Sequence, residues 1–402
     1  MRLYKVFTMY DKEANEKTLN YMQAVRGFGD KSRRKYLIDL NRYSEFNDMS
    51  LEELLNEAEE DEDANIRMRR RRITQRLYEF QEYLEKNPHT HPQTKKTVYL
   101  SPTTINSIIG SVKLFYMTYD IQLPLIKYRR TRKENLKDVL TKKEIRTSLE
   151  TSTSKLHRAV ITILASSGLD IDTLLKITVG DYLRACKDYT YYSRTQDMIK
   201  DLAGKHEIIP TFIMDRGKTR YEHIFFFSPE ACDYLNIYLL DRLKRQGSIE
   251  KDELLVPIKK SGVHSFFNKL NDDLNFGWTS NGTRRRFRPH AMRSFFATSL
   301  QGTIINEGVM IDSMIIEFML GHTIPTTTAA YYKKKPEVLK NVYLRLIPKL
   351  TFMSTTRVKT ISSPEFKELQ RQLEQYEELE RKVEKLEKLE DLYRKLERLS
   401  LE

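Results

Sequence analysis

Residues 284–300 read RRRFRPHAMRSFFATSL and contain five arginines within ten positions. Proline favours the first turn of a helix, so the sequence predicts a helix that begins after Pro289. His290 and Arg293 are three positions apart in this helix, and their side chains therefore leave the same face. An imidazole and a guanidinium on one face can converge on a single anionic group.

A second motif follows at residues 320–334, which read LGHTIPTTTAAYYKK. Gly321 predicts the end of a helix and a sharp turn before His322. Tyr331 comes nine positions after His322 and is expected on a short helix of its own. No cluster of Asp or Glu accompanies the two motifs, which argues against a two-metal nuclease, because such a site needs carboxylates to hold its cations. The sequence therefore predicts a site with neither metal nor cofactor.

The order and spacing of these motifs resemble the tyrosine recombinases, or phage-type integrases, and look most like the archaeal members of that family. The matching residues are His290, Arg293 and Phe296-Ala297-Thr298; Leu320-Gly321-His322; Thr327 and Thr328 before Tyr331; and Lys218-Thr219 with Ser228–Ala231. The resemblance covers residues 141–350, and the helical segment before them resembles the family's core-binding domain.

The resemblance implies that Tyr331 is the nucleophile that attacks a DNA phosphate. Arg293, His290 and His322 would bind the phosphate oxygens or move the proton of the nucleophile. Lys218 would protonate the departing 5′ oxygen, a role that Arg216 or Arg220 in the same turn could hold instead. The implied product is a 3′-phosphotyrosyl link with a free 5′ hydroxyl, formed without metal or ATP. The implied function is that of a site-specific DNA recombinase or integrase of a mobile genetic element.

One family residue is replaced. The family's first Arg follows a Gly-Leu pair, whereas this chain reads Ser166-Ser167-Gly168-Leu169-Asp170. Asp inverts the charge where two cations should hold the phosphate, and losing one such group typically costs about 10² to 10³ in rate. Lys176, or one of Arg284, Arg285 and Arg286, is a candidate to supply the charge. A DNA-binding accessory protein without cleavage and a type IB-like DNA-relaxing enzyme therefore stay open as alternatives.

The charge balance favours a polyanionic partner. Lys and Arg total 69 against 56 Asp and Glu, a net charge of +13 with a pI near 9.3, and double-stranded DNA is the leading candidate. The residues that we expect to contact DNA are Arg67, Arg69, Arg70, Arg71 and Arg72; Lys127, Arg129, Arg130 and Arg132; and Arg284, Arg285, Arg286 and Arg288. We expect these arginines inside one helix that continues through Leu77, Phe80, Tyr83 and Leu84. The run at 67–72 is equally compatible with a solvated helix face.

Cysteine content and hydropathy bear on location. Cys186 and Cys232 are the only cysteines, so neither a disulfide framework nor a cysteine-based zinc site is available, and we expect a reducing, cytoplasmic compartment. No run of 18 apolar residues occurs, and the first 17 residues lack the apolar core of a signal peptide. We expect neither a membrane span nor secretion.

The chain is expected to be mainly α-helical with a small antiparallel β-sheet. We expect a helical core-binding domain at residues 1–126, a basic linker at 127–140, an α+β catalytic domain at 141–350 and an amphipathic helix or coiled coil at 351–402. Capping motifs at Ser50, Ser101 and Thr141 predict helix starts. Two β-rich runs, 208–214 and 223–227, flank a predicted hairpin turn.

The C-terminal segment carries apolar residues at spacings of three or four from Leu369 to Leu399. This spacing predicts one long amphipathic helix. Its basic and acidic residues nearly balance, so it is not the expected DNA-binding surface. A homo-oligomer on DNA, either a dimer or a tetramer, is the expected assembly.

Deleting the chain from Ser363 onward should leave the folding of the monomer and simple DNA binding intact, because the apolar stripe of this segment needs another surface. Self-association should weaken, and sedimentation velocity measures this change. Unchanged association after the deletion would instead indicate that the segment docks on its own chain.

Overall fold

The computed structural model describes residues 9–90, 97–129, 138–216, 221–280, 282, 284–306, 313–322 and 336–353. They divide into two compact units, one within residues 1–134 and one within 135–402, and the boundary lies inside the basic stretch 127–140. The described residues are mainly helical and include two small antiparallel sheets of two strands each, which confirms the expected fold class. The expected C-terminal helix lies outside the described residues.

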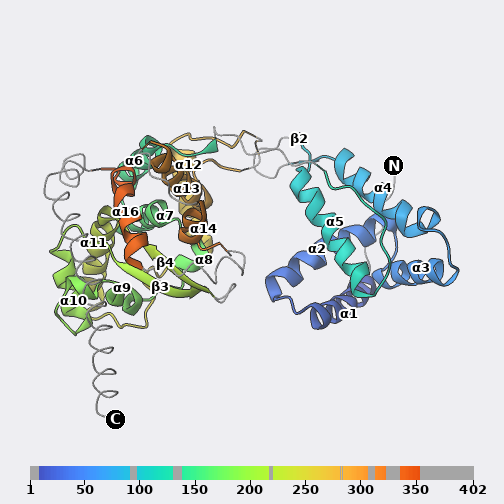
Figure 1. The fold of residues 1–402 in the computed structure, drawn as a ribbon, viewed down its shortest axis with the longest axis horizontal. Coiled ribbons are helices and arrows are strands. Elements are labelled where there is room, and N and C mark those ends of the chain that lie inside the picture. The colour runs from blue at the N-terminus through green and yellow to red at the C-terminus, as the bar shows by residue number, and fades with distance from the viewer. Residues whose placement is uncertain are drawn as a thin grey trace, which may run out of the picture. The chain divides into compact units, whose positions relative to one another are not determined.

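The first unit is built from helices and one short strand pair (Figure 1). Its elements are α1 (Met9–Arg26), α2 (Asp30–Asn47), α3 (Leu51–Asp63), η1 (Met68–Arg70), α4 (Arg72–Lys86), β1 (His89–Thr90), β2 (Thr97–Val98) and α5 (Pro102–Thr118). Side chains from all five α-helices form one buried core, among them Leu19, Leu40, Leu54, Phe80 and Phe115.

Side-chain caps fix the starts of two of these helices. The Ser50 hydroxyl accepts a hydrogen bond from the Glu53 backbone N–H over 3.1 Å, and the Glu53 carboxylate accepts one from the Ser50 N–H over 2.7 Å. Ser101 caps α5 in the same way by accepting from the Thr104 N–H. These bonds satisfy N–H groups that have no partner within the helix, and they confirm both predicted starts.

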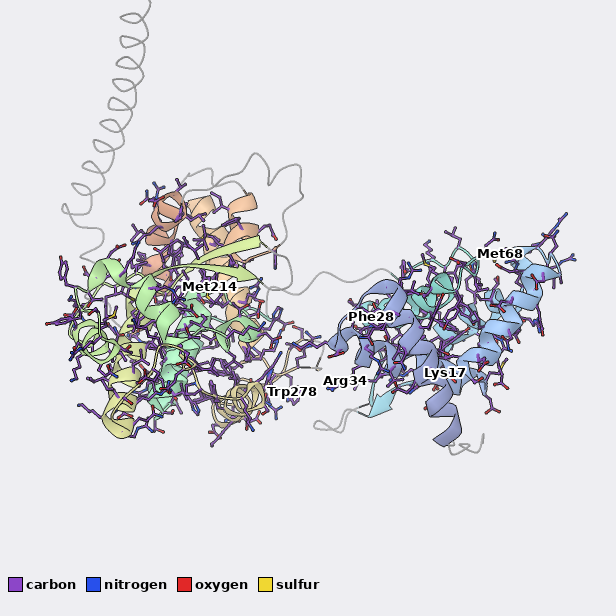
Figure 2. The ribbon with its side chains drawn as sticks, turned by 90° about the horizontal axis from the view of Figure 1, so that it is seen from below. Lys17, Phe28, Arg34, Met68, Met214 and Trp278 are labelled. Atoms are coloured by element: carbon purple, nitrogen blue, oxygen red, sulfur yellow. The ribbon has the colours of Figure 1, made fainter. Side chains whose placement is uncertain are left out.

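The arginine run at 67–72 does not lie inside one helix, although the sequence pattern predicts that it should. Met68–Arg70 forms the 3₁₀ turn η1, and α4 begins only at Arg72. Met68 is labelled in Figure 2. The predicted continuation of α4 through Leu77 and Phe80 is confirmed, and both side chains are buried.

Acidic residues of α3 explain this break. Arg71 is buried and pairs with the Glu62 carboxylate. The Asp61 carboxylate accepts hydrogen bonds from the Arg72 backbone N–H over 2.5 Å and from the Arg72 Nε over 2.8 Å. Two of the five arginines are thus bound within the unit. Arg71 is the one buried member of the run. Arg67, Arg69 and Arg70 are exposed, and Arg72 is exposed as well although it is paired.

The second unit holds the remaining described elements. They are α6 (Lys142–Thr151), α7 (Lys155–Ser167), α8 (Ile171–Leu174), α9 (Val179–Ala185), η3 (Lys187–Tyr189), α10 (Thr195–Ala203), β3 (Thr211–Arg216), β4 (Tyr221–Phe226), α11 (Pro229–Gln246), α12 (Lys260–Asp273), α13 (Pro289–Asn306), α14 (Ser313–Met319) and α16 (Pro336–Leu350). None of the described helices is both long and apolar enough to cross a membrane.

Helix α7 lies at the centre of the second unit (Figure 1). Residues 159–167 of this helix are all buried, and α11, α13 and β4 pack against it. Tyr343 of α16 is also buried and donates a hydrogen bond to the Ser166 carbonyl oxygen over 2.8 Å. This packing fixes the C-terminal end of α7, where the chain turns at Gly168.

Strands β3 and β4 form an antiparallel hairpin in which Thr211 pairs with Phe226 and Arg216 with Tyr221. The first strand begins three positions later than predicted, because the run at 208–210 ends in Pro210, which lacks the N–H that a strand ladder uses. The turn at residues 217–220, which includes Lys218, lies outside the described residues.

Replacing Asp61 by Asn should destabilise the first unit by about 2 kcal/mol, because Arg72 loses its charged acceptor. Burial alone would raise the pKa of Asp61, but hydrogen bonds from the Arg72 side chain and backbone outweigh it and hold this pKa below its usual range. A carboxyl group whose pKa is lowered by folding stabilises the fold at pH values above its unfolded-state pKa of about 3.9. This stability is lost as the pH falls through the folded-state pKa. The effect of Asp61→Asn should therefore shrink in acid.

Hydrogen exchange of peptides from α3 and α4 measures this loss in the full chain. Glu60→Gln is the matched control, since Glu60 also contacts Arg72 but its side chain is 69% exposed. An equal loss in both variants would contradict the role given to Asp61.

Candidate active site

Arg293 is the best-anchored cation of the predicted site. It lies in α13 and is only 9% exposed. Its Nη1 donates a hydrogen bond to the Gly168 carbonyl oxygen over 2.7 Å, and its Nη2 donates to the Leu320 carbonyl oxygen over 2.6 Å. The same Nη2 lies 2.9 Å from the His322 Nε2. Three acceptors from two separate turns, the one at Gly168 and the one at residues 320–322, therefore fix one guanidinium.

A glycine is required at position 168, where the carbonyl oxygen accepts the hydrogen bond from the Arg293 Nη1. Its φ of +66° is a left-handed conformation that favours glycine, and a Cβ placed there would lie 2.4 Å from the Phe296 ring. The absence of a side chain lets α13 approach the end of α7. This approach brings the Gly168 carbonyl within reach of Arg293.

The hydrogen bonds of His322 define its tautomer. A guanidinium only donates, so the His322 Nε2 accepts from Arg293, and the proton resides on Nδ1, which donates to the Glu317 carboxylate. The imidazole is therefore neutral in this arrangement and is oriented from both sides. The sequence motif predicted His322 but gave no sign of Glu317, which lies one turn earlier on α14.

His223 of β4 holds the turn that precedes His322. It is buried, and its Nε2 donates a hydrogen bond to the Met319 carbonyl oxygen over 3.1 Å. Gly321 has a φ of +66°, and a Cβ there would lie 2.9 Å from the His223 ring. The hairpin that leads to residues 217–220 is thus packed directly against the Leu-Gly-His turn.

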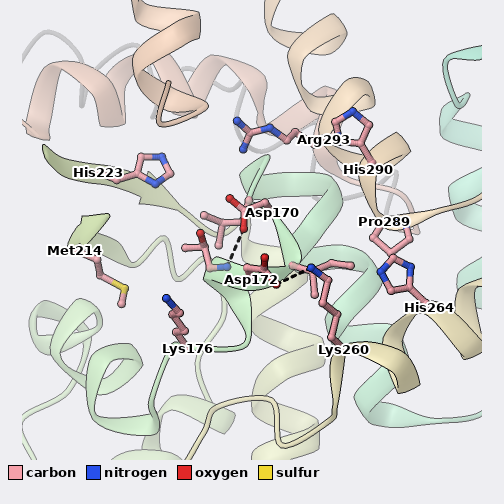
Figure 3. A pocket seen from close by; sticks show the side chains of 13 residues that line it. Asp170, Asp172, Lys176, Met214, His223, Lys260, His264, Pro289, His290 and Arg293 are labelled. Carbon is pink, nitrogen blue, oxygen red and sulfur yellow. Dashed lines mark hydrogen bonds and ion pairs between the residues drawn. The ribbon is translucent and has the colours of Figure 1, made fainter. Parts of the chain in front are cut away.

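A cavity of about 380 Å³ lies beside Arg293. Figure 3 shows side chains from several helices and from the β3–β4 hairpin around it. The residues that line it are Leu169, Asp170, Ile171, Asp172, Thr173, Lys176, Met214, His223, Lys260, His264, Pro289, His290 and Arg293. The structure therefore brings together three predicted residues, Arg293, His290 and Lys176, and joins His322 to them through Arg293.

Asp170, the position at which the family resemblance predicts an arginine, has a structural role. It is the N-cap of α8, and its carboxylate accepts a hydrogen bond from the Thr173 N–H over 2.8 Å. Asp is among the best N-cap residues, so this change keeps the local turn while it reverses the charge. Lys176 follows two residues after α8, is exposed and lines the same cavity.

The sequence interpretation missed several cavity residues. His223, Lys260, His264 and Asp172 were not predicted, because isolated charged and imidazole side chains on separate elements share no spacing pattern. No described group of three or more His, Cys, Asp or Glu is placed to hold a metal ion. Lys218 and Tyr331 lie outside the described residues, so their predicted roles stay predictions. The neighbouring Tyr332, which is one position late for the family spacing, also lies outside them.

The arginines before α13 do not line the cavity, whereas Arg293 of α13 does. Arg285 donates to both Asp272 oxygens over 2.7 and 2.8 Å and lies over the ring of Trp278, which Figure 2 labels. Its hydrogen bonds hold the pKa of Asp272 below its usual range. Arg286 pairs with Glu144 over 2.9 Å. Neither residue lines the cavity, where the resemblance predicts an arginine at position 170.

The other predicted DNA-contacting residues are spread over the surface. Lys127 and Arg129 are exposed, and Arg129 pairs with Glu85. Arg284 is exposed, whereas Arg288 donates to the Arg285 carbonyl oxygen over 2.9 Å. Arg130 and Arg132 lie outside the described residues.

A family profile matches more than half of the chain. The phage integrase family matches residues 129–337, and the chain belongs to this family. This match confirms the resemblance drawn from the sequence motifs.

Two relatives are tyrosine recombinases named XerC. The protein of Listeria innocua serovar 6a is 26% identical over 159 residues, and the aligned region spans 38% of this chain and 47% of that relative, about half its length. The protein of Leptospira interrogans serogroup Icterohaemorrhagiae serovar copenhageni is 24% identical over 342 residues, which cover 84% of this chain and 93% of that relative.

Two solved structures resemble the chain at low identity. The XerH site-specific recombinase bound to its palindromic difH substrate is 13% identical, with a TM-score of 0.45, and the match covers 84% of this chain and 97% of that one. The Tn1549 transposon integrase in complex with transposon right end DNA is 14% identical, with a TM-score of 0.43, and the match covers 82% and 99%.

Replacing Gly168 by Ala should destabilise the second unit by about 3 kcal/mol, because both the left-handed backbone and the contact with Phe296 oppose a Cβ. Gly277→Ala is the control, since Gly277 has a φ of +75° but nothing lies within 4 Å of the place that its Cβ would occupy. That variant should lose only about 1 kcal/mol.

Trp278 is the only tryptophan and belongs to the second unit, so urea unfolding followed by its fluorescence measures both variants. Equal losses in the two variants would show that backbone strain alone matters at Gly168. The packing of α13 against this turn would then not depend on the missing side chain.

Proposed function

We propose that the protein is a site-specific DNA recombinase that cleaves and rejoins DNA through a 3′-phosphotyrosyl intermediate, without metal or ATP. The observation that carries the proposal is the fixed Arg293 guanidinium beside a cavity that His290 also lines. A guanidinium offers donors that match the non-bridging oxygens of a phosphate. Family membership supports the same chemistry.

The proposed reaction exchanges one phosphoester for another. The Tyr331 hydroxyl oxygen attacks the phosphorus, the bond to the 5′ oxygen breaks, and a proton reaches that oxygen to leave a free hydroxyl. A tyrosine has an ordinary pKa of about 10, so the site must stabilise both the phenolate and the charged phosphorane. Because the phosphoester energy is kept, the reverse attack by another strand's 5′ hydroxyl can complete recombination.

The remaining roles follow from position and motif. His290 is exposed at the cavity and is suited to bind a phosphate oxygen or to receive the tyrosine proton. The neutral His322 keeps Arg293 oriented and can donate or accept a proton when DNA binds. Lys218, by its place in the family motif, is the proposed donor to the departing 5′ oxygen.

Lys176 is the proposed source of the charge lost at position 170. It lines the cavity, and no described residue pairs with its ammonium group. Lys lacks the planar fork of Arg, so we expect it to replace the charge but not the paired hydrogen bonds. Cleavage should therefore be slower than in an enzyme that has both arginines.

The second candidate function is a DNA-binding accessory protein that has this fold but does not cleave. The N-cap role of Asp170 favours it, because this residue serves the turn and brings a negative charge to the cavity. A DNA-relaxing enzyme of the type IB kind would use the same cavity to cut and reseal one strand. In each case double-stranded DNA is the proposed partner, and a homo-oligomer on DNA is proposed for the recombinase.

A nicked duplex pool with randomised sequence around the nick tests the proposal without knowledge of the target. Cleavage next to the nick releases a short strand, which prevents religation and traps the protein on DNA. We expect an SDS-resistant adduct whose recovered DNA converges on one sequence. Tyr331→Phe should abolish the adduct and leave binding unchanged, since only the attacking oxygen is removed, whereas Tyr332→Phe should retain it.

Each outcome separates the candidates. Adducts lost in Tyr332→Phe rather than Tyr331→Phe would move the nucleophile by one residue. Binding without any adduct would support the accessory protein. Adducts on single sites without a joined product from two sites would support the DNA-relaxing enzyme.

A further inference from the structure

A second lysine faces the same cavity in an ion pair. Lys260 begins α12, and its Nζ lies 2.7 Å from the Asp172 Oδ1. Both residues line the cavity beside Arg293 (Figure 3). The pair therefore joins the α8 segment, which carries Asp170, to a helix that the sequence motifs did not include.

This ion pair is accessible to solvent on both sides. The Lys260 side chain is 50% exposed and that of Asp172 is 37% exposed. Exposed pairs of this kind contribute little to stability, because water screens the charges and the long lysine chain loses freedom. A stronger anion that enters the cavity can therefore take Lys260 from Asp172 at small cost.

A DNA phosphate is an anion of the required kind. Its non-bridging oxygens accept the same charge-assisted hydrogen bond from an ammonium group that a carboxylate oxygen accepts. The cavity already presents Arg293 and His290 to such a group. The Asp170 carboxylate also lines the cavity, and its Oδ1 accepts a hydrogen bond from the Thr173 N–H.

We propose that Lys260 binds a DNA phosphate at this cavity, and that Asp172 occupies Lys260 until DNA displaces it. This inference rests on the proposed DNA recombinase function. It adds a cation from α12 to the site and gives Asp172 the role of an internal competitor. Lys176, which has no described partner, would bind phosphate without such competition.

The first test measures binding to a random-sequence duplex as a function of salt. Lys260→Ala should lower the slope of log K against log salt by about 0.9 and weaken binding by a factor on the order of 5 to 10 at 0.1 M salt. Lys260→Arg should retain both values. The control is Lys269→Ala. Lys269 pairs with Asp273 on the same helix, and its Nζ and the Asp273 Oδ2 are also 2.7 Å apart.

The second test measures whether Asp172 acts through Lys260. Asp172→Asn should strengthen binding by about twofold to fivefold. This gain should disappear when Lys260 is Ala, because no lysine remains to be released. Asp273→Asn makes the same charge change on α12 and should leave binding within a factor of about two.

A gain from Asp172→Asn that persists in the Lys260→Ala background would overturn the competition, and an unchanged salt slope in Lys260→Ala would overturn the phosphate contact. Circular dichroism of each variant checks that it is folded, and a misfolded Lys260→Ala leaves Lys260→Gln for the same comparison. Both tests measure DNA binding and do not require that the protein cleaves DNA. If the protein binds DNA but never forms a covalent adduct, the cleavage proposal fails while these tests still decide on Lys260.

Discussion

The second unit is organised around one guanidinium that is almost removed from water. A buried charge is costly unless fixed polar groups surround it. The carbonyl oxygens of Gly168 and Leu320 and the Nε2 of His322 supply such groups to Arg293. These acceptors come from the turn after α7 and from the turn after α14, so the position of Arg293 depends on both turns. Each turn contains a glycine whose missing side chain makes room for a neighbouring ring. The fold is in this sense arranged to hold a cation beside a cavity.

Asp170 shows how a site can change while its supporting turn persists. Leu169 and Gly168 keep the backbone that presents a carbonyl to Arg293, and Asp170 starts α8 as an efficient N-cap. Under the proposed function, a carboxylate lies at the cavity where the resemblance predicts a cation, and this carboxylate makes the cap bond of the turn. Lys176 and Lys260 line the same cavity and bring positive charge from two other positions. Under the proposed function, these two lysines supply the positive charge that an arginine at position 170 would bring to the cavity.

The sequence predicted what depends on local spacing. Helix starts at Ser50, Ser101 and Thr141 follow from capping bonds between near neighbours, and the motifs located Arg293 and His322. It could not predict the contact of His223 with the Gly321 turn or the Lys260–Asp172 pair, because these contacts join elements far apart in the chain. The prediction of one helix through the arginine run at 67–72 was wrong. The sequence pattern does not show which acidic side chains these arginines pair with once the chain is folded. The structure shows instead that α3 carboxylates bind Arg71 and Arg72 and set the start of α4.

Under the proposed function, Arg293 and its cavity receive the phosphate at which the DNA strand is cut. A structure of the protein bound to a nicked duplex would show where this phosphate lies. We expect the phosphate next to the nick in the cavity, with a non-bridging oxygen within hydrogen-bond distance of the Arg293 guanidinium and with the Tyr331 oxygen facing the phosphorus. A complex in which the duplex is bound but that phosphate lies outside the cavity, with Arg293 contacting only protein, would contradict it.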